Sequence, residues 1–123
     1  MKRRSKAVGE GIPSIIILKS GELVGAGPEE KVCRGIEEEG IPFEIRMDPE
    51  RSTARLALKA ALASRLDVGV GIGADRTVAV QHSKLDDETP LFTGSGDSAD
   101  LDLRALGVNA ARLVKGLPFI SIA

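Results

Sequence analysis

A run of four branched aliphatic residues, Ile15-Ile16-Ile17-Leu18, limits the choice of fold more than any other part of the sequence. Branched aliphatic side chains favour strands, and a strand that is apolar at every position must be buried on both of its faces. Such strands are typical of parallel sheets, because the connections between parallel strands place helices on both faces of the sheet. The run therefore predicts an α/β protein.

The segments that follow alternate as this class of fold requires. Pro28 and Gly40 mark the start and the end of a short helix. Asp48 and Pro49 predict the N-cap and the first position of a second helix. Four strands and three helices are expected in all: strands at residues 13–18, 43–47, 67–72 and 76–81, and helices at residues 28–40, 48–65 and 99–115.

This order predicts a single compact α/β domain at residues 13–123, with a mainly parallel sheet of about four strands and about three helices. The third and fourth strands are joined so tightly that they should form a hairpin. Residues 1–12 are expected to be a flexible basic tail and residues 82–98 a long loop. The side chains predicted to face the sheet are Val32, Cys33 and Ile36 in the first helix, Ala54, Ala57, Leu58, Ala61 and Leu62 in the second, and Leu103, Leu106, Ala110, Leu113 and Val114 in the third.

The composition excludes several classes of function. The 123 residues include three Phe and neither Tyr nor Trp, so the chain lacks the aromatic side chains that stack on single-stranded nucleic acid. A formal net charge of −1 provides no overall field that attracts a polyanion. One Cys and one His exclude an internal disulfide, a thiolate-rich zinc site and a His-rich metal centre. The longest apolar run is too short to span a membrane. The lack of an internal disulfide fits a reducing compartment, so we expect a cytoplasmic protein.

No convincing catalytic set is present. Gly69-Val70-Gly71-Ile72-Gly73 has the glycine spacing of a dinucleotide-binding motif, but a strand follows it where that motif needs a helix. We attribute these glycines to the close approach of another backbone segment. Gly94-Ser95-Gly96 precedes a helix, but the aspartates that follow would repel a phosphate. Cys33 is predicted to be a small core residue and His82 a surface residue.

Three carboxylates, Glu37, Glu38 and Glu39, crowd the C-terminal end of the first predicted helix. The helix dipole makes each of these placements unfavourable by about 0.3–1 kcal/mol. Glu38 lies about 200° round the helix axis from Ile36, which should face the core, so its side chain is expected to point outward. Two interpretations stay open, a solvated surface or a carboxylate offered to a cation or a basic partner. A single Glu cannot hold a metal ion alone, so a cation site would need ligands from another chain.

Asn109 is the second unusual position, because Asn is mildly unfavourable inside a helix. It is either exposed on the solvent side or, with the small Ala110 and Ala111 and the neighbouring Arg112, part of a close contact with another element or chain.

Two blocks of sequence resemble the small subunit of the diol/glycerol dehydratase reactivating factor. They are residues 35–43, with the sequence GIEEEGIPF, and residues 109–119, with the sequence NAARLVKGLPF. Shorter matches at residues 68–72 and 89–93 occur in the same order, so the resemblance extends over about residues 13–119. The medium subunit of the adenosylcobalamin-dependent dehydratases shares these blocks more loosely.

The chain also departs from the family pattern. Residues 94–106 are rich in Gly and Asp, and residues 86–88 are unusually acidic. The lone His is displaced by one position, so we assign no role to His82.

The resemblance implies a non-catalytic small subunit of a chaperone-like reactivase. It implies a heterotetramer with a large ATPase subunit, in which Mg and ATP or ADP are bound by the large subunit and no cofactor is bound by this chain alone. It further implies that the small subunit docks on the dehydratase and takes the place of its medium subunit, which allows damaged cobalamin to leave. Association with a bacterial microcompartment is compatible with the resemblance.

The resemblance also implies roles for particular residues. In the family, the middle Glu of the Glu-Glu-Glu run reaches into the large subunit and helps to hold a divalent cation there. This position is Glu38, which we predict to be a metal ligand shared with the large subunit. Glu37, Glu39, Asn109 and Arg112 are predicted to lie at the interface. The isolated chain would expose this surface, and its self-association is left open.

Two other functions stay open. The chain could be a medium subunit of a cobalamin-dependent diol/glycerol dehydratase, although it lacks the N-terminal extension that such subunits carry. A small stand-alone α/β enzyme or phosphate binder is disfavoured by the missing catalytic set. No nucleic-acid or membrane partner is expected.

Overall fold

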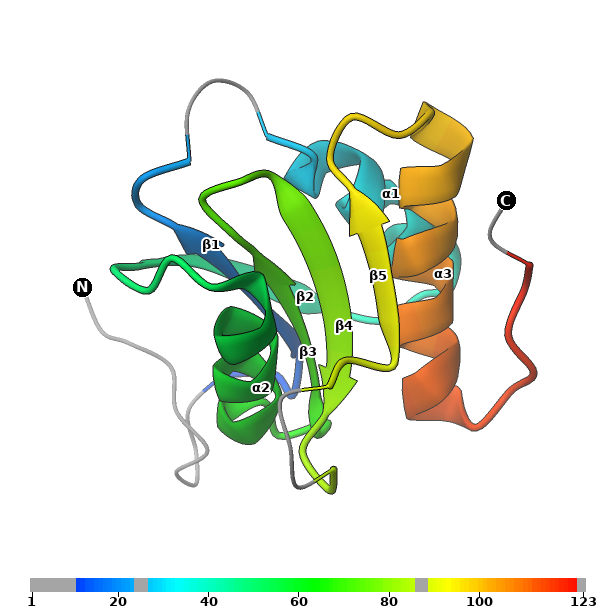
Figure 1. Cartoon of the computed structure of the whole chain (residues 1–123). Helices are drawn as coiled ribbons and strands as arrows, with labels where there is room; N and C mark the ends of the chain where they lie inside the picture. The colour runs from blue at the N-terminus through cyan, green and yellow to red at the C-terminus, as the bar shows by residue number, and fades with distance from the viewer. Residues whose placement is uncertain (1–10, 24–26, 86–88, 122–123) are drawn as a thin grey trace.

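The aliphatic run forms β1 (Ile15–Ser20), an interior strand of the sheet (Figure 1). The computed structural model describes residues 11–23, 27–85 and 89–121. In it, β1 lies between β2 (Phe43–Asp48) and β3 (Val68–Ile72) and runs parallel to both. The side chains of the run are buried on both faces of the sheet, as the sequence predicted.

The sheet continues through two antiparallel strands, β4 (Thr77–His82) and β5 (Phe92–Ser95). The strand order is β2-β1-β3-β4-β5. Within the described residues the sheet is therefore mixed and has five strands, where about four, mainly parallel, were expected. The predicted hairpin between β3 and β4 is present. β5 lies within residues 82–98, which were predicted to be a loop. The strand was not predicted because its four residues contain too few apolar side chains to form a recognisable pattern.

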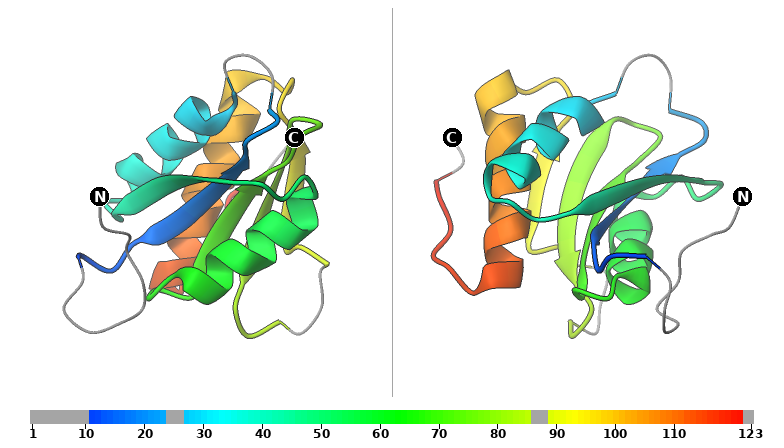
Figure 2. Two further views of the ribbon diagram at one scale, coloured as in Figure 1. Left: turned by 90° about the vertical axis from the view of Figure 1, so that its left-hand side faces the viewer. Right: turned by 180° about the vertical axis from the view of Figure 1, so that it is seen from behind.

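In the part of the chain that the structure describes, three helices cover the two faces of the sheet, which confirms the predicted three-helix α/β domain (Figure 2). α1 (Glu29–Glu38) and α3 (Asp100–Lys115) pack on each other over one face, and α2 (Thr53–Ala63) covers the other. No helix in the described part of the chain is long and apolar enough to cross a membrane. All but the last two residues of the predicted basic tail lie outside the described residues.

The glycines of β3 allow α2 to lie directly on the sheet. A Cβ atom at Gly69 would lie 2.1 Å from the backbone nitrogen of Ala61, and one at Gly71 would lie 2.4 Å from that of Ala57. Real Cβ atoms do not approach other atoms so closely, so only glycine fits at either position. The glycine-rich strand is therefore explained by backbone packing, and no helix follows it to bind a dinucleotide.

α2 begins later than the sequence predicted. Its N-cap is Ser52, whose hydroxyl accepts a hydrogen bond from the Arg55 N–H at 3.3 Å. Asp48 instead ends β2 and accepts a hydrogen bond from the Glu50 N–H at 2.9 Å, which turns the chain before the helix starts. The buried face of α2 is also rotated about the helix axis from the predicted face, so that Leu62 is exposed. The buried residues of α2 are Leu56, Ala57, Ala60 and Ala61.

α1 and α3 cross in close contact at two glycines. A Cβ atom at Gly35 would lie 2.0 Å from the Arg104 carbonyl oxygen, and one at Gly107 would lie 1.9 Å from the Val32 carbonyl oxygen. This crossing sets the position of the end of α1 relative to the charged side chains of α3.

Candidate functional site

The three carboxylates at the end of α1 lie in different environments. α1 ends at Glu38, and Glu39 follows as its C-cap. Glu37 and Glu38 are exposed, whereas only 15% of the Glu39 side chain is accessible. Cationic side chains of α3 lie against this end of α1 and compensate for negative charge at the negative end of a helix dipole.

Glu39 connects α1 to the last turn of α3. The Lys115 ammonium lies 2.9 Å from Glu39 Oε1 and also donates to the Glu39 backbone carbonyl at 2.8 Å. Arg112 Nη2 donates to Glu39 Oε2 at 3.3 Å. The hydrogen bond from Lys115, supported by that from Arg112, holds the pKa of the Glu39 carboxyl below its usual value. Glu39 thus joins two helices of its own chain, and its role at an interface with another subunit stays a prediction.

Glu38 forms an ion pair with Arg104, whose Nε donates to Glu38 Oε2 at 2.7 Å. The two side chains are 47% and 36% exposed, so the pair lies at the surface, where helix geometry placed Glu38. The positive charge of the Arg104 guanidinium repels a metal cation from the same carboxylate. Glu38 can therefore bind a metal ion only after the ion pair opens, and then as one ligand among several. Within the described residues, no three His, Cys, Asp or Glu side chains gather to hold a metal. The metal role of Glu38 stays a prediction that requires ligands from another chain.

A pocket lies beside this ion pair, between α1 and the first turns of α3. It is lined by Lys31, Arg34, Asp100, Leu101 and Arg104. Leu101 is 70% exposed and is surrounded by charged side chains. We call this pocket together with Glu38 the α1–α3 surface.

Asn109 is fully buried, so its interpretation as an exposed residue is wrong. Its Nδ2 donates to the Ile120 carbonyl at 3.0 Å, and its Oδ1 accepts from the Ile120 N–H at 2.8 Å. Arg112 Nη1 donates to the Pro118 carbonyl at 3.2 Å. The chain folds back after α3, and these contacts hold residues 117–121, which we call the C-terminal segment. A role for Asn109 at a subunit interface stays a prediction, and it would require this segment to move.

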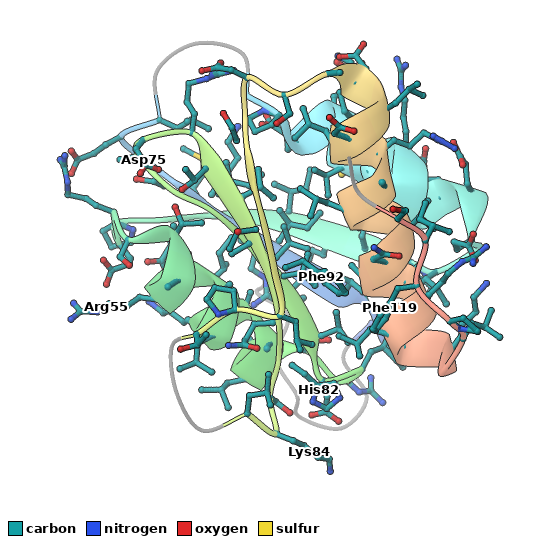
Figure 3. The ribbon with its side chains drawn as sticks, turned by 45° about the vertical axis from the view of Figure 1, so that its right-hand side comes forward. Arg55, Asp75, His82, Lys84, Phe92 and Phe119 are labelled. Carbon is teal, nitrogen blue, oxygen red and sulfur yellow. The ribbon has the colours of Figure 1, made fainter. Side chains whose placement is uncertain are left out.

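An aromatic pair adds to the attachment of the C-terminal segment. The rings of Phe92 in β5 and Phe119 are 4.8 Å apart between centroids and meet edge to face at 86° (Figure 3). Edge-to-face pairs contribute beyond their burial, by about 0.5–1.5 kcal/mol. Two of the three Phe residues of the chain are thus used to hold this segment.

The two remaining candidates, Cys33 and His82, lie in different elements of the described structure, in α1 and at the end of β4. Burial raises the pKa of the Cys33 thiol to about 12, with Glu37 and Glu29 adding to the effect, so the thiol stays protonated at neutral pH. His82 Nδ1 accepts a hydrogen bond from the Lys84 N–H at 3.1 Å, in the turn after β4. Asp75 lies at the opposite end of β4 (Figure 3), whereas Ser83, next to His82, donates to the Asp67 carboxylate at 2.7 Å.

Sequence reasoning missed Arg104, Leu101 and Lys115. Nothing in the local pattern of α3 distinguishes these side chains from those of any solvated helix. The available signal was the excess of negative charge at the end of α1, which requires cations from elsewhere in the fold.

Comparison with known proteins gives consistent matches over nearly the whole chain. The profile of the dehydratase medium subunit family matches residues 12–120. The propanediol dehydratase-reactivating factor small subunit of Citrobacter freundii is 44% identical over 107 residues, which covers 87% of this chain and 90% of the relative.

Two solved structures have the same fold as this chain. A glycerol dehydratase reactivase chain superposes with a TM-score of 0.87 at 34% identity, covering 91% of this chain and 100% of that one. A chain of a diol dehydratase-reactivating factor complexed with ADP and Mg²⁺ superposes with a TM-score of 0.81 at 36% identity, covering 90% of this chain and 100% of that one.

Proposed function

This chain belongs to the small subunits of the diol/glycerol dehydratase reactivating factors, and we propose that it acts by replacing a subunit of its target. In this proposal it pairs with a large ATPase subunit, docks on a cobalamin-dependent dehydratase and occupies the position of the dehydratase medium subunit. The dehydratase is thereby loosened and releases damaged cobalamin. ATP binding and hydrolysis in the large subunit drive the cycle, in the cytoplasm. The chain itself contributes surfaces and no chemistry.

The observation that carries this proposal is the match of the dehydratase medium subunit profile to residues 12–120. The reactivating-factor small subunit and the dehydratase medium subunit therefore share one domain plan over almost all of this chain. Two proteins with the same fold and related surfaces can compete for the same position on a third protein. The burial that keeps the Cys33 thiol protonated also favours an accessory role over one in which this thiol acts as a nucleophile.

A nucleotide-dependent partner is supported by a relative. The related diol dehydratase-reactivating factor was solved with ADP and Mg²⁺. Since no three metal-ligating side chains gather among the described residues of this chain, we assign Mg²⁺ and nucleotide to the large subunit. We further propose that the α1–α3 surface meets this subunit, with Glu38 leaving Arg104 to complete a divalent-cation site shared by the two chains.

Co-purification distinguishes this function from the alternative of a dehydratase medium subunit. The chain is co-expressed with a large reactivase ATPase subunit or with the dehydratase large subunit, and complexes are isolated with and without Mg²⁺ and ADP. We expect a stable complex with the ATPase subunit. Failure to associate with it would refute the proposal, and cobalamin-binding complexes with the dehydratase large subunit would establish the alternative.

The Glu38→Gln substitution tests the proposed cation contact. Glutamine keeps the size of the side chain but removes the charge that attracts a cation. We expect the affinity for the large subunit to fall about tenfold, with a loss of divalent cation from the purified complex. Calorimetric titration of the two subunits measures the affinity, and elemental analysis measures the bound metal.

Glu22→Gln is the matched control. Glu22 is also exposed and pairs with Arg51, and neither residue belongs to the α1–α3 surface, so this variant likewise removes one exposed ion pair to an arginine. It should leave the affinity and the metal content unchanged. If Glu38→Gln behaves as this control does, the cation role is wrong, whereas the wider assignment still depends on the co-purification result.

A further inference from the structure

β2 is an edge strand with one side open. Among the described residues it pairs with β1 alone, and Figure 2 shows it at the outer margin of the sheet. An unpaired edge presents a row of backbone donors and acceptors that can pair with another strand.

The hydrogen bonds to β1 identify the outward groups. The Ile15 N–H donates to the Pro42 carbonyl, and the Gly21 N–H donates to the Asp48 carbonyl, both at 2.9 Å. Backbone groups of successive residues in a strand point in opposite directions, so the even-numbered residues of β2 face β1. The N–H and C=O groups of Phe43, Ile45 and Met47 therefore point away from the sheet.

The two faces of β2 carry different side chains. Ile45 and Met47 are 41% and 64% exposed, which is unusual for apolar side chains on a strand, and they share their face with Phe43. The other face carries charges of both signs: Arg46 Nε lies 2.9 Å from Glu44 Oε2. One face of the strand is thus apolar, and the other carries negative and positive side chains in turn.

We propose that β2 pairs antiparallel with β2 of a second copy of this chain, about a two-fold axis at Ile45. In this register Ile45 meets its own equivalent, and Phe43 meets Met47 of the other copy. All of these are residues whose backbone groups point outward, so each pair exchanges two hydrogen bonds. On the opposite face, Glu44 meets Arg46 of the other copy, and Arg46 meets Glu44. The two five-stranded sheets become one continuous sheet.

Neighbouring registers are disfavoured by like charges opposite one another or by a missing hydrogen-bond donor. An axis at Arg46 would place Arg46 opposite Arg46 and Glu44 opposite Asp48, and an axis at Glu44 would place Glu44 opposite itself. Like charges directly opposite one another destabilise a strand pair. An axis at Met47 would bring Ile45 opposite Pro49, which has no N–H to donate. Only the axis at Ile45 combines three hydrogen-bonded pairs with opposite charges.

Reversing the charges on β2 tests the pairing in the isolated chain. Sedimentation equilibrium, at concentrations up to the solubility limit, measures the dimer dissociation constant. We expect the wild type to dimerise and Arg46→Glu to raise the dimer dissociation constant about tenfold or more, because it faces Glu44 of the other copy. The double variant Glu44→Arg/Arg46→Glu should return to within about threefold of wild type. Arg34→Glu, which changes the net charge equally but lies on α1, should dimerise as wild type does.

Cysteine cross-linking tests the register and does not depend on the stability of the charge variants. Paired Ile45 residues would have Cα atoms about 5.5 Å apart, within disulfide range, whereas the two Met47 residues would be about 14 Å apart. Ile45→Cys should therefore form a disulfide dimer faster than Met47→Cys, although Met47 is more exposed. The native Cys33 is buried and does not compete.

A wild-type chain that stays monomeric at every concentration would overturn the proposal and leave this edge to a different protein. Equal dimerisation of Arg46→Glu, or faster cross-linking at residue 47, would overturn it as well. These outcomes concern the isolated chain and are independent of whether it binds the ATPase subunit.

Discussion

Replacing Gly107 by Ala is expected to destabilise the protein by about 3 kcal/mol, because the new methyl group has no space. Its Cβ would lie 1.9 Å from the Val32 carbonyl oxygen and 2.9 Å from the carbonyl carbon. These are backbone atoms of a helix, so they cannot rotate away and α1 must move off α3. Alanine gains about 1 kcal/mol over glycine in helix propensity, which offsets only part of this cost. Gly35→Ala should behave similarly, since its Cβ would lie 2.0 Å from the Arg104 carbonyl oxygen.

Urea denaturation followed by circular dichroism measures this loss. Gly21→Ala is the matched control, because the nearest atom to a Cβ there is 3.8 Å away, an ordinary contact. We expect that variant to keep the wild-type midpoint or to rise slightly, since alanine restricts the unfolded chain. An unchanged midpoint for Gly107→Ala would show that the helices are not in the close contact described above.

Replacing Asn109 by Ala is expected to destabilise the protein by about 2 kcal/mol and to release the C-terminal segment. The amide of Asn109 is fully buried and makes both of its hydrogen bonds with the backbone of Ile120. Alanine replaces neither bond and leaves a small cavity beside the segment. In this variant the C-terminal segment keeps the edge-to-face contact of Phe119 with Phe92 and the contact of Arg112 with Pro118.

Hydrogen exchange measures the local part of this effect and urea denaturation the global part. The Ile120 amide should exchange faster in Asn109→Ala by at least about tenfold, because its acceptor is gone. Ile120→Ala keeps the backbone groups that Asn109 binds, and it should retain slow exchange at residue 120. If Asn109→Ala leaves this amide protected, the segment is held by its side chains and not by the buried amide.

Much of the fold was predictable because the signals for it are local. The aliphatic run of β1 and the Pro28–Gly40 boundaries each depend on neighbouring residues. The start of α2 was misplaced because both Asp48 and Ser52 are good capping residues, and only the pairing of β2 with β1 determines that Asp48 ends the strand. The α2 face is rotated because the helix meets the sheet where Gly69 and Gly71 allow Ala57, Ala60 and Ala61 to approach.

The candidate site was predictable only in part. The run of Glu37, Glu38 and Glu39 identified the end of α1, and helix periodicity placed Glu38 outward. The same reasoning could not distinguish Glu39, which is held by α3, from its exposed neighbours. Nor could it reveal that Asn109 is buried, because its partner is the backbone of a segment with no regular structure.

The sequence by itself determined the α/β class, most of the elements and the family to which the chain is similar. Helix caps, periodicity and motif blocks act over a few residues, so they can be read without the fold. The tertiary structure decided which carboxylates pair, which amide is buried and which strand edge stays open. The Glu38–Arg104 hydrogen bond joins residues 66 positions apart, and that from Lys115 to Glu39 spans 76. Such contacts exist only because α1 and α3 cross at two glycines, and no local pattern encodes which distant charges that crossing brings together.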